Sequence, residues 1–171
     1  FLDGLLIKSE NYQALKLLLN KYKEKVQTIY IDPPFNKEQD ADYLYNVKYK
    51  DSTWVSMLEN RLWLAKILLN DKGSIFVRCD YNGNMYVRML LNGVFGEENF
   101  RNELAISRIS KQDPKVRRFN TATDSIYLFS KSEKFGIRLV FKKLAKAKSE
   151  RWHAMDSQGQ GQPLYIFGYL L

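Results

Sequence analysis

The spacing of apolar residues changes several times along the first hundred positions. Short apolar runs at residues 5–7, 26–31 and 74–79 predict buried strands. Between and after these runs, apolar residues recur every three or four positions, which predicts helices. The first helix carries Leu15, Leu18, Leu19 and Tyr22 behind a candidate cap at Ser9, the second covers 54–69 and ends near 71–73, and the third covers 84–92. Strands alternating with helices in this order are typical of an α/β fold with a mainly parallel sheet.

The second part of the chain has a different pattern. Residues 103–110 and 125–130 alternate between apolar and polar side chains and predict two strands. A turn at 131–134 leads into a third predicted strand at 136–141. We expect these strands to be antiparallel.

Beyond these strands, residues 142–151 predict a short basic helix or an extended arm, and residues 156–163 a flexible loop. An apolar, strand-like run follows at 165–171 and would be unusual as a free end. Because the chain also starts without methionine, we expect it to be part of a longer polypeptide.

Composition narrows the class of protein. With 171 residues, 45% of them hydrophobic, the chain is long enough for one folded domain. Cys79 is the only cysteine, expected in the core, and His153 is the only histidine, which excludes an intrachain disulfide and the usual zinc cluster. No apolar run approaches the roughly 20 residues of a membrane helix, and the N-terminus has no secretory leader pattern. We therefore expect a cytoplasmic protein with no metal and no membrane contact.

Charge is distributed unevenly along the chain. Residues 1–100 carry 13 basic and 13 acidic side chains, whereas residues 101–171 carry 14 and 6, so the whole net charge of +8 lies in the second part. A basic segment attached to a neutral one indicates nucleic-acid contact. A solvated basic face is the alternative.

Three acidic residues lie just past predicted strands: Glu10, Asp32 and Asp80. Because an open α/β sheet binds ligands outside the carboxyl ends of its strands, we expect these residues to lie together. The plainer interpretation makes Glu10 an acid of the first helical turn and Asp80 a helix cap.

The most informative segment is an apolar strand that runs into Asp32-Pro33-Pro34-Phe35-Asn36. A residue before proline is pushed out of the helical region, and each proline fixes its own φ near −65°, so the turn is rigid. The Asp32 carboxylate and the Pro33 carbonyl then form two neighbouring acceptors, which Phe35 can cover. A planar ligand with an NH2 group fits this arrangement, and an exocyclic nucleobase amine is such a group.

This segment resembles the catalytic motif of S-adenosylmethionine-dependent DNA amino-methyltransferases. Further similarities lie in Ser52-Thr53-Trp54, Asn60-Arg61-Leu62, residues 73–77 and residues 95–100. Together they resemble the β-group adenine enzymes, especially the modification subunits of type III restriction systems. The resemblance covers about residues 3 to 131.

The resemblance implies a role for each matching residue. Asp32, Pro33, Pro34 and Phe35 would be catalytic, and Asp32 with Glu10 and Asp80 would bind S-adenosylmethionine. Asn36, Thr53 and Asp124 would contact the substrate, joined by four residues of a basic loop: Arg108, Lys111, Arg117 and Arg118. The plainer interpretations place Trp54 in the core and Asn60 and Arg61 on the polar edge of a helix. The glycine-rich cofactor loop of the family is absent from these 171 residues.

The implied architecture is an incomplete Rossmann-like α/β methyltransferase sheet followed by an antiparallel, β-rich, basic target-recognition portion. We place the catalytic domain at residues 1–131, with the basic loop 107–120 inserted before its last strand, and the start of the target-recognition region at 132–171. Expected partners are double-stranded DNA, a restriction subunit and a second copy of the protein. N4-cytosine methylation and an inactive DNA-binding or subunit-interaction module are the alternatives to N6-adenine methylation.

Overall fold

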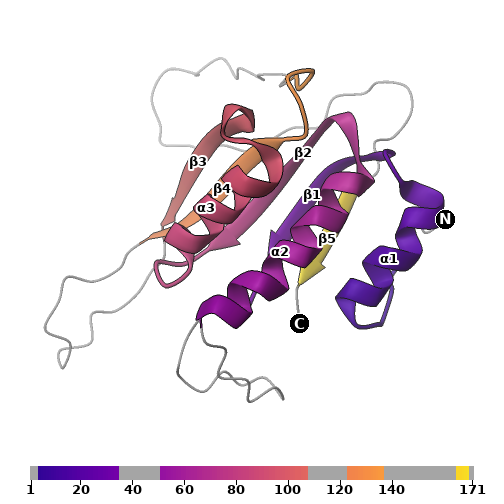
Figure 1. The fold of residues 1–171 in the computed structure, drawn as a ribbon, viewed down its shortest axis with the longest axis horizontal. Coiled ribbons are helices and arrows are strands. Elements are labelled where there is room, and N and C mark those ends of the chain that lie inside the picture. Colours follow the sequence, from indigo (N-terminus) through magenta and orange to yellow (C-terminus); the bar gives the residue numbers. More distant parts are fainter. Residues whose placement is uncertain (1–3, 35–50, 108–122, 137–164, 170–171) are drawn as a thin grey trace, which may run out of the picture.

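The computed structural model describes residues 4–34, 51–107 and 123–136, and the backbone of 165–169. These residues form a five-stranded sheet in the order β3-β4-β2-β1-β5 (Figure 1). The strands are β1 (Val26–Asp32), β2 (Leu69–Cys79), β3 (Phe100–Ser107), β4 (Thr123–Ser130) and β5 (Tyr165–Tyr169). The helices are α1 (Asn11–Tyr22), α2 (Asp51–Leu68) and α3 (Asn84–Phe95), with a short 3-10 turn at Glu97–Asn99.

The sheet is mixed, as an α/β fold with added antiparallel strands requires. β1 pairs in parallel with both β2 and β5, whereas β4 is antiparallel to both β2 and β3. The antiparallel strands predicted in the second part of the sequence therefore extend the parallel sheet. Residues 165–169, on the target-recognition side of the predicted 131/132 boundary, also belong to this sheet. That domain boundary stays a prediction.

One face of the sheet carries the hydrophobic core. Ile29, Ile75 and Phe129 form one row across β1, β2 and β4, and Ile31 with Val77 belongs to the next row. These side chains are buried against α2 and α3, which lie in front of the sheet in Figure 1, and side chains of α1 pack at the margin of the same core. Because side chains alternate along a strand, the residues between them point to the opposite face. Asp32 is on that opposite face.

Two sequence predictions about the N-terminal segment are wrong. Residues 5–7 form no strand, and Leu5 and Leu6 are 74% and 96% exposed, so this apolar triplet contributes nothing to the described core. The cap of α1 is Glu10, not Ser9, since the Glu10 carboxylate accepts a hydrogen bond from the Gln13 amide at 3.0 Å.

Element boundaries differ elsewhere by a few residues. α2 ends at Leu68 and β2 begins directly at Leu69, so the predicted helix end near 71–73 lies inside the strand. The register shifts between Val26 and Thr28 of β1. Gly73 belongs to this irregular part, and a Cβ atom there would come within 3.0 Å of the Val26 carbonyl oxygen. The turn predicted at 131–134 is confirmed. The segments predicted at 137–164 lie outside the described residues.

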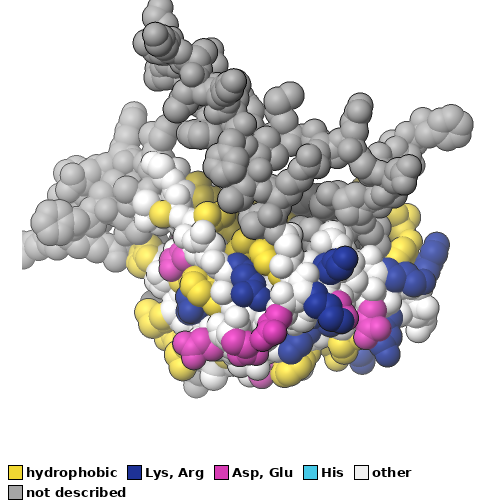
Figure 2. All heavy atoms as spheres, turned by 90° about the horizontal axis from the view of Figure 1, so that it is seen from above, with side chains coloured by type: hydrophobic (Ala, Val, Ile, Leu, Met, Phe, Trp, Pro, Cys, Tyr) yellow, Lys and Arg dark blue, Asp and Glu magenta, His cyan; other side chains and the backbone are white. Residues whose placement is uncertain are grey.

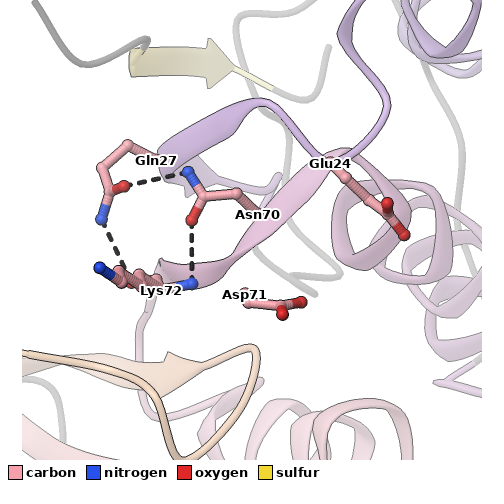
Figure 3. A pocket seen from close by; sticks show the side chains of 5 residues that line it. All are labelled: Glu24, Gln27, Asn70, Asp71 and Lys72. Carbon is pink, nitrogen blue, oxygen red and sulfur yellow. Dashed lines mark hydrogen bonds between the residues drawn. The ribbon is translucent and has the colours of Figure 1, made fainter. Parts of the chain in front are cut away.

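The amino ends of β1 and β2 border a pocket lined by polar side chains (Figure 3). Gln27 donates to the Lys72 carbonyl at 3.1 Å and accepts from Asn70 at 3.0 Å, while the Asn70 side-chain oxygen accepts from the Lys72 amide at 2.9 Å. These groups satisfy one another. These hydrogen bonds therefore join the amino ends of β1 and β2, at the end of the sheet opposite Asp32.

Charged side chains of both signs are interspersed over the described part of the face shown in Figure 2. Of the 14 basic residues in 101–171, only Arg101, Lys131 and Lys134 are described, and each has a structural contact. Arg101 donates to the Ser130 hydroxyl, Lys131 to the Leu69 carbonyl, and Lys134 pairs with Asp71 at 2.8 Å. The residues on which the DNA-contact prediction depends lie outside the described ranges.

Within the described ranges, no helix has both the length and the apolarity to span a membrane.

Candidate active site

The proline turn starts where β1 ends, at the carboxyl edge of the sheet. Asp32 is the last residue of β1, Pro33 is buried and Pro34 is exposed. The indole nitrogen of Trp54 donates to the Pro34 carbonyl at 2.8 Å, and Trp54 is itself 1% exposed. A Cβ atom on Gly83 would come within 3.0 Å of the Trp54 ring, so the ring has little space to move. The prediction that Trp54 lies in the core is confirmed, and the structure adds that it anchors the turn.

Asp32 forms an ion pair with a residue on the neighbouring strand. Ile31 lies opposite Val77, which places Arg78 beside Asp32 on the same face of the sheet. The Arg78 Nη1 atom is 3.1 Å from Asp32 Oδ2. Arg78 is not among the site residues predicted from the sequence, although it is the only charged residue in the predicted strand 74–79.

Arg78 is held in turn by Asp124 at the start of β4. Its Nη2 atom donates to Asp124 Oδ2 at 2.7 Å, and its Nε atom to the same oxygen at 3.3 Å. The Asp124 side chain is fully buried. The structure therefore connects Asp124 to the turn through Arg78, and the substrate contact expected of Asp124 stays a prediction.

Burial and charge act in opposite directions on Asp32. Burial raises the pKa of the Asp32 carboxyl group, and the nearby Asp124 charge adds to this increase, while Arg78 opposes it by charge and hydrogen bonding. The net pKa of Asp32 is raised. The hydrogen bond to Asp124 raises the pKa of Arg78, so the Arg78 guanidinium group stays protonated.

Asp80 follows β2, as predicted, and is 1% exposed. Its carboxylate accepts from the Asn82 amide at 3.1 Å and from the Asn82 side chain at 2.9 Å, and its carbonyl accepts from the Asn84 amide. These bonds shape the turn into α3. The plainer interpretation of Asp80 as the helix cap is wrong, because the N-cap of α3 is Gly83 and no side chain makes a capping hydrogen bond there.

Glu10 follows no strand, so the basis for placing it with Asp32 and Asp80 is absent. Besides capping α1, its carboxylate pairs with Arg61 of α2 at 2.8 Å. Arg61 also donates to the Asn11 side chain and to the Met57 carbonyl. This network joins α1 to α2 and shows a structural role for Arg61.

Of the remaining predicted site residues, one lies inside the described ranges and the others lie outside them. Thr53 lies in the first turn of α2 and is exposed, one residue from the anchoring Trp54. Outside the described ranges are Phe35, Asn36, Arg108, Lys111, Arg117 and Arg118. Their assigned roles stay predictions.

Cys79 is buried, as expected, which raises the pKa of its thiol to about 12. Among the described side chains, no group of three His, Cys, Asp or Glu residues could hold a metal ion.

Comparison with known proteins connects this geometry to one family. Residues 26–164 match the family model described as DNA methylase, whose label combines N6 and N4 methyltransferases. The chain is 37% identical over 145 residues to the "Probable type III restriction-modification enzyme HindVI Mod subunit" of Haemophilus influenzae, covering 82% of this chain and 19% of that protein. It is 28% identical over 154 residues to the type III restriction-modification enzyme EcoP15I Mod subunit of Escherichia coli, covering 72% and 23%.

A solved structure shows the same fold. The M1.HpyAVI–SAM complex superposes with a TM-score of 0.53 at 18% identity, covering 85% of this chain and 60% of that chain. The chain spans about a fifth to a quarter of the length of the two Mod subunits. The family match covers most of the chain and includes the Asp32 turn, and on this evidence the chain belongs to the N6/N4 DNA methylase family.

Proposed function

We propose that this chain forms the target-amine side of the active site in an adenine-N6 DNA methyltransferase of a type III restriction-modification system. The observation that carries the proposal is the Asp32 carboxylate. It is partly buried at the carboxyl edge of the sheet, begins a rigid proline turn, and is held in place by Arg78. Family membership and similarity to Mod subunits support DNA as the substrate.

In this proposal, the Asp32 carboxylate and the Pro33 carbonyl each accept a hydrogen bond from one of the two hydrogens of the exocyclic amine. Accepting both hydrogens draws the nitrogen lone pair out of conjugation with the base, so that it becomes nucleophilic. A hydrogen bond to a charged group contributes about 1.5–3 kcal/mol. Stacking of the base on Phe35 would add about 1–3 kcal/mol. Together these terms offset the few kcal/mol lost when a base leaves the duplex.

S-adenosylmethionine, when bound, would supply an electrophilic methyl group to the nitrogen of the target amine. Among the described residues, the three predicted cofactor ligands fit this molecule poorly, because their carboxylates already have protein partners. That of Asp32 is paired with Arg78. The Glu10 carboxylate is occupied by the α1 cap and Arg61, and the Asp80 carboxylate by Asn82. The roles we assign to the described residues are therefore confined to the target amine.

The test is a methyl-transfer assay on the intact protein with labelled S-adenosylmethionine and duplex DNA, followed by mass spectrometry of the modified base. N6-methyladenine supports the proposal. N4-methylcytosine would keep the mechanism and correct the base, since both amines fit the same two acceptors. The Asp32→Asn variant is expected to lose transfer and to keep DNA binding. Absence of transfer on DNA of diverse sequence would refute the proposal and favour an inactive binding module.

The basic loop and the protein partners are part of the same proposal. Reversing the charges of Arg117 and Arg118 should weaken DNA binding and flatten its salt dependence, because each neutralised phosphate contributes about 0.9 to the slope of log K against log salt. An unchanged slope would remove the loop from the interface. Co-purification with a restriction subunit, and the mass of the complex in solution, test the expected partner and the second copy.

A further inference from the structure

Arg78 is the residue that determines how the Asp32 carboxylate is held. It interrupts the apolar run of β2 and lies beside Asp32 on the face of the sheet opposite the helices. Its guanidinium group bridges two carboxylates, Asp32 at 3.1 Å and Asp124 at 2.7 Å. A charged residue in the middle of a sheet requires such partners, and here one of the partners is the proposed amine acceptor.

We propose that Arg78 is a positioning residue, which holds Oδ2 of Asp32 so that Oδ1 stays available to the target amine. This inference rests on the proposed function. It deepens that function by assigning the geometry of the amine acceptor to a residue that contacts neither the base nor the methyl donor.

The attachment of Arg78 to Asp124 makes this positioning precise. Three donor atoms of one planar group are used: Nη1 for Asp32, and Nε and Nη2 for Asp124. Asp124 is fully buried on β4, which pairs with β2 in a continuous register from Ser74 to Cys79. The orientation of the guanidinium is therefore fixed by the sheet. A lysine could supply the charge but not this fork of donors.

Arg78 also keeps Asp32 in the form that the reaction needs. Accepting hydrogen bonds from an amine requires an ionised carboxylate, because a protonated one becomes a donor. Burial and the Asp124 charge both raise the pKa of Asp32, and Arg78 is the cation that opposes them. The other described titratable groups beside this pair are Asp124 on β4 and Tyr30 on β1.

The experiment compares three variants of the intact protein: Arg78→Met, Arg78→Lys and the control Arg101→Met. Arg101 is a strand arginine of the same sheet that contacts Ser130 and neither carboxylate. Steady-state rates are measured for each variant from pH 5 to 9, normalised to the folded fraction.

We expect Arg78→Met to lower kcat on the order of 10- to 100-fold, the scale for a misplaced catalytic group, with little change in KM for DNA. The acidic limb of its rate profile should move to higher pH, since the charge that lowers the pKa of Asp32 is gone. Arg78→Lys should restore the acidic limb and leave kcat low. Arg101→Met should change neither.

Two results would overturn the inference. One is a kcat and a pH profile of Arg78→Met that match the Arg101→Met control. The other is full recovery of kcat in Arg78→Lys, which would reduce Arg78 to a source of charge. If Arg78→Met does not fold, Asp124→Asn replaces it, with the acidic limb expected at lower pH and an unmoved limb counting against the inference. A wild-type protein that transfers no methyl group refutes the proposed function itself, whereas an active wild type beside an unaffected Arg78→Met refutes only this inference.

Discussion

The hydrogen bond between Trp54 and Pro34 gives a quantitative test of how the turn that follows Asp32 is held. Trp54→Phe removes the donor of the 2.8 Å bond and leaves an aromatic ring in a site that is 1% exposed. The lost hydrogen bond costs about 0.5–1.5 kcal/mol. The smaller ring leaves a void costing about a further 1–2 kcal/mol, below the 3–5 kcal/mol of truncation to alanine. The free energy of unfolding should therefore fall by about 1.5–3.5 kcal/mol.

The matched control is Trp63→Phe on the same helix. Trp63 is 44% exposed, and a phenyl ring there can keep the contact with the Lys66 ammonium group, which lies 5.3 Å from the ring centre. Its substitution should change stability by less than about 0.5 kcal/mol. Urea unfolding followed by far-UV circular dichroism measures both variants, and methyl transfer is assayed where both remain folded.

The activity measurement decides the role of the bond. Per folded molecule, Trp54→Phe should have a lower kcat than Trp63→Phe, because the turn that carries Asp32 has lost its anchor. Equal activity of the two variants, with the stability difference present, would show that Trp54 only fills the core. Equal stability would refute the energetic reasoning as well.

Three further predictions concern single residues. Asp32→Asn should lose activity but be at least as stable as the wild type at pH 7. Because the pKa of Asp32 is raised in the folded state, its contribution to stability is present at low pH and declines as the pH rises above about 4. Thermal melting of both proteins over pH 3–7 would detect this difference. The Cys79 thiol, with its pKa raised to about 12, should resist iodoacetamide at pH 7.5 and react after unfolding, as mass spectrometry would show. Glu24 has a left-handed φ of 57°, so Glu24→Gly should raise stability by roughly 0.5–1 kcal/mol in urea unfolding; a loss would show that its 3.9 Å ion pair with Lys131 outweighs the strain.

The parts of the fold that could be predicted from sequence are those with a repeating local pattern. β1 and the three helices follow from apolar spacing, and Asp32 at a strand end follows from the proline turn. Residues 5–7 show where such a pattern misleads: an apolar triplet resembles a buried strand, but a strand also needs a pairing partner, which local spacing does not record.

The missed part of the site depends on pairing between distant strands. Arg78 and Asp124 are separated by 46 residues, and only the register of β2 against β4 brings them together. The single charge within an apolar strand was a signal that a buried partner exists, but it did not say which carboxylate. Trp54 is similar, since its spacing indicates the core and its bond to Pro34 appears only in three dimensions.

The pairing of β1 with β5 has a consequence for synthesis of the protein. Thr28 and Tyr165 are register partners, so the strand that ends in Asp32 is translated about 140 residues before its outer neighbour. At about 5–20 residues per second, this interval lasts on the order of ten seconds. During that time one edge of β1 exposes unpaired backbone groups to other chains. β1 then has an edge open to misassociation while the rest of the chain is made, and a chaperone that covers this edge would act on the strand that carries Asp32.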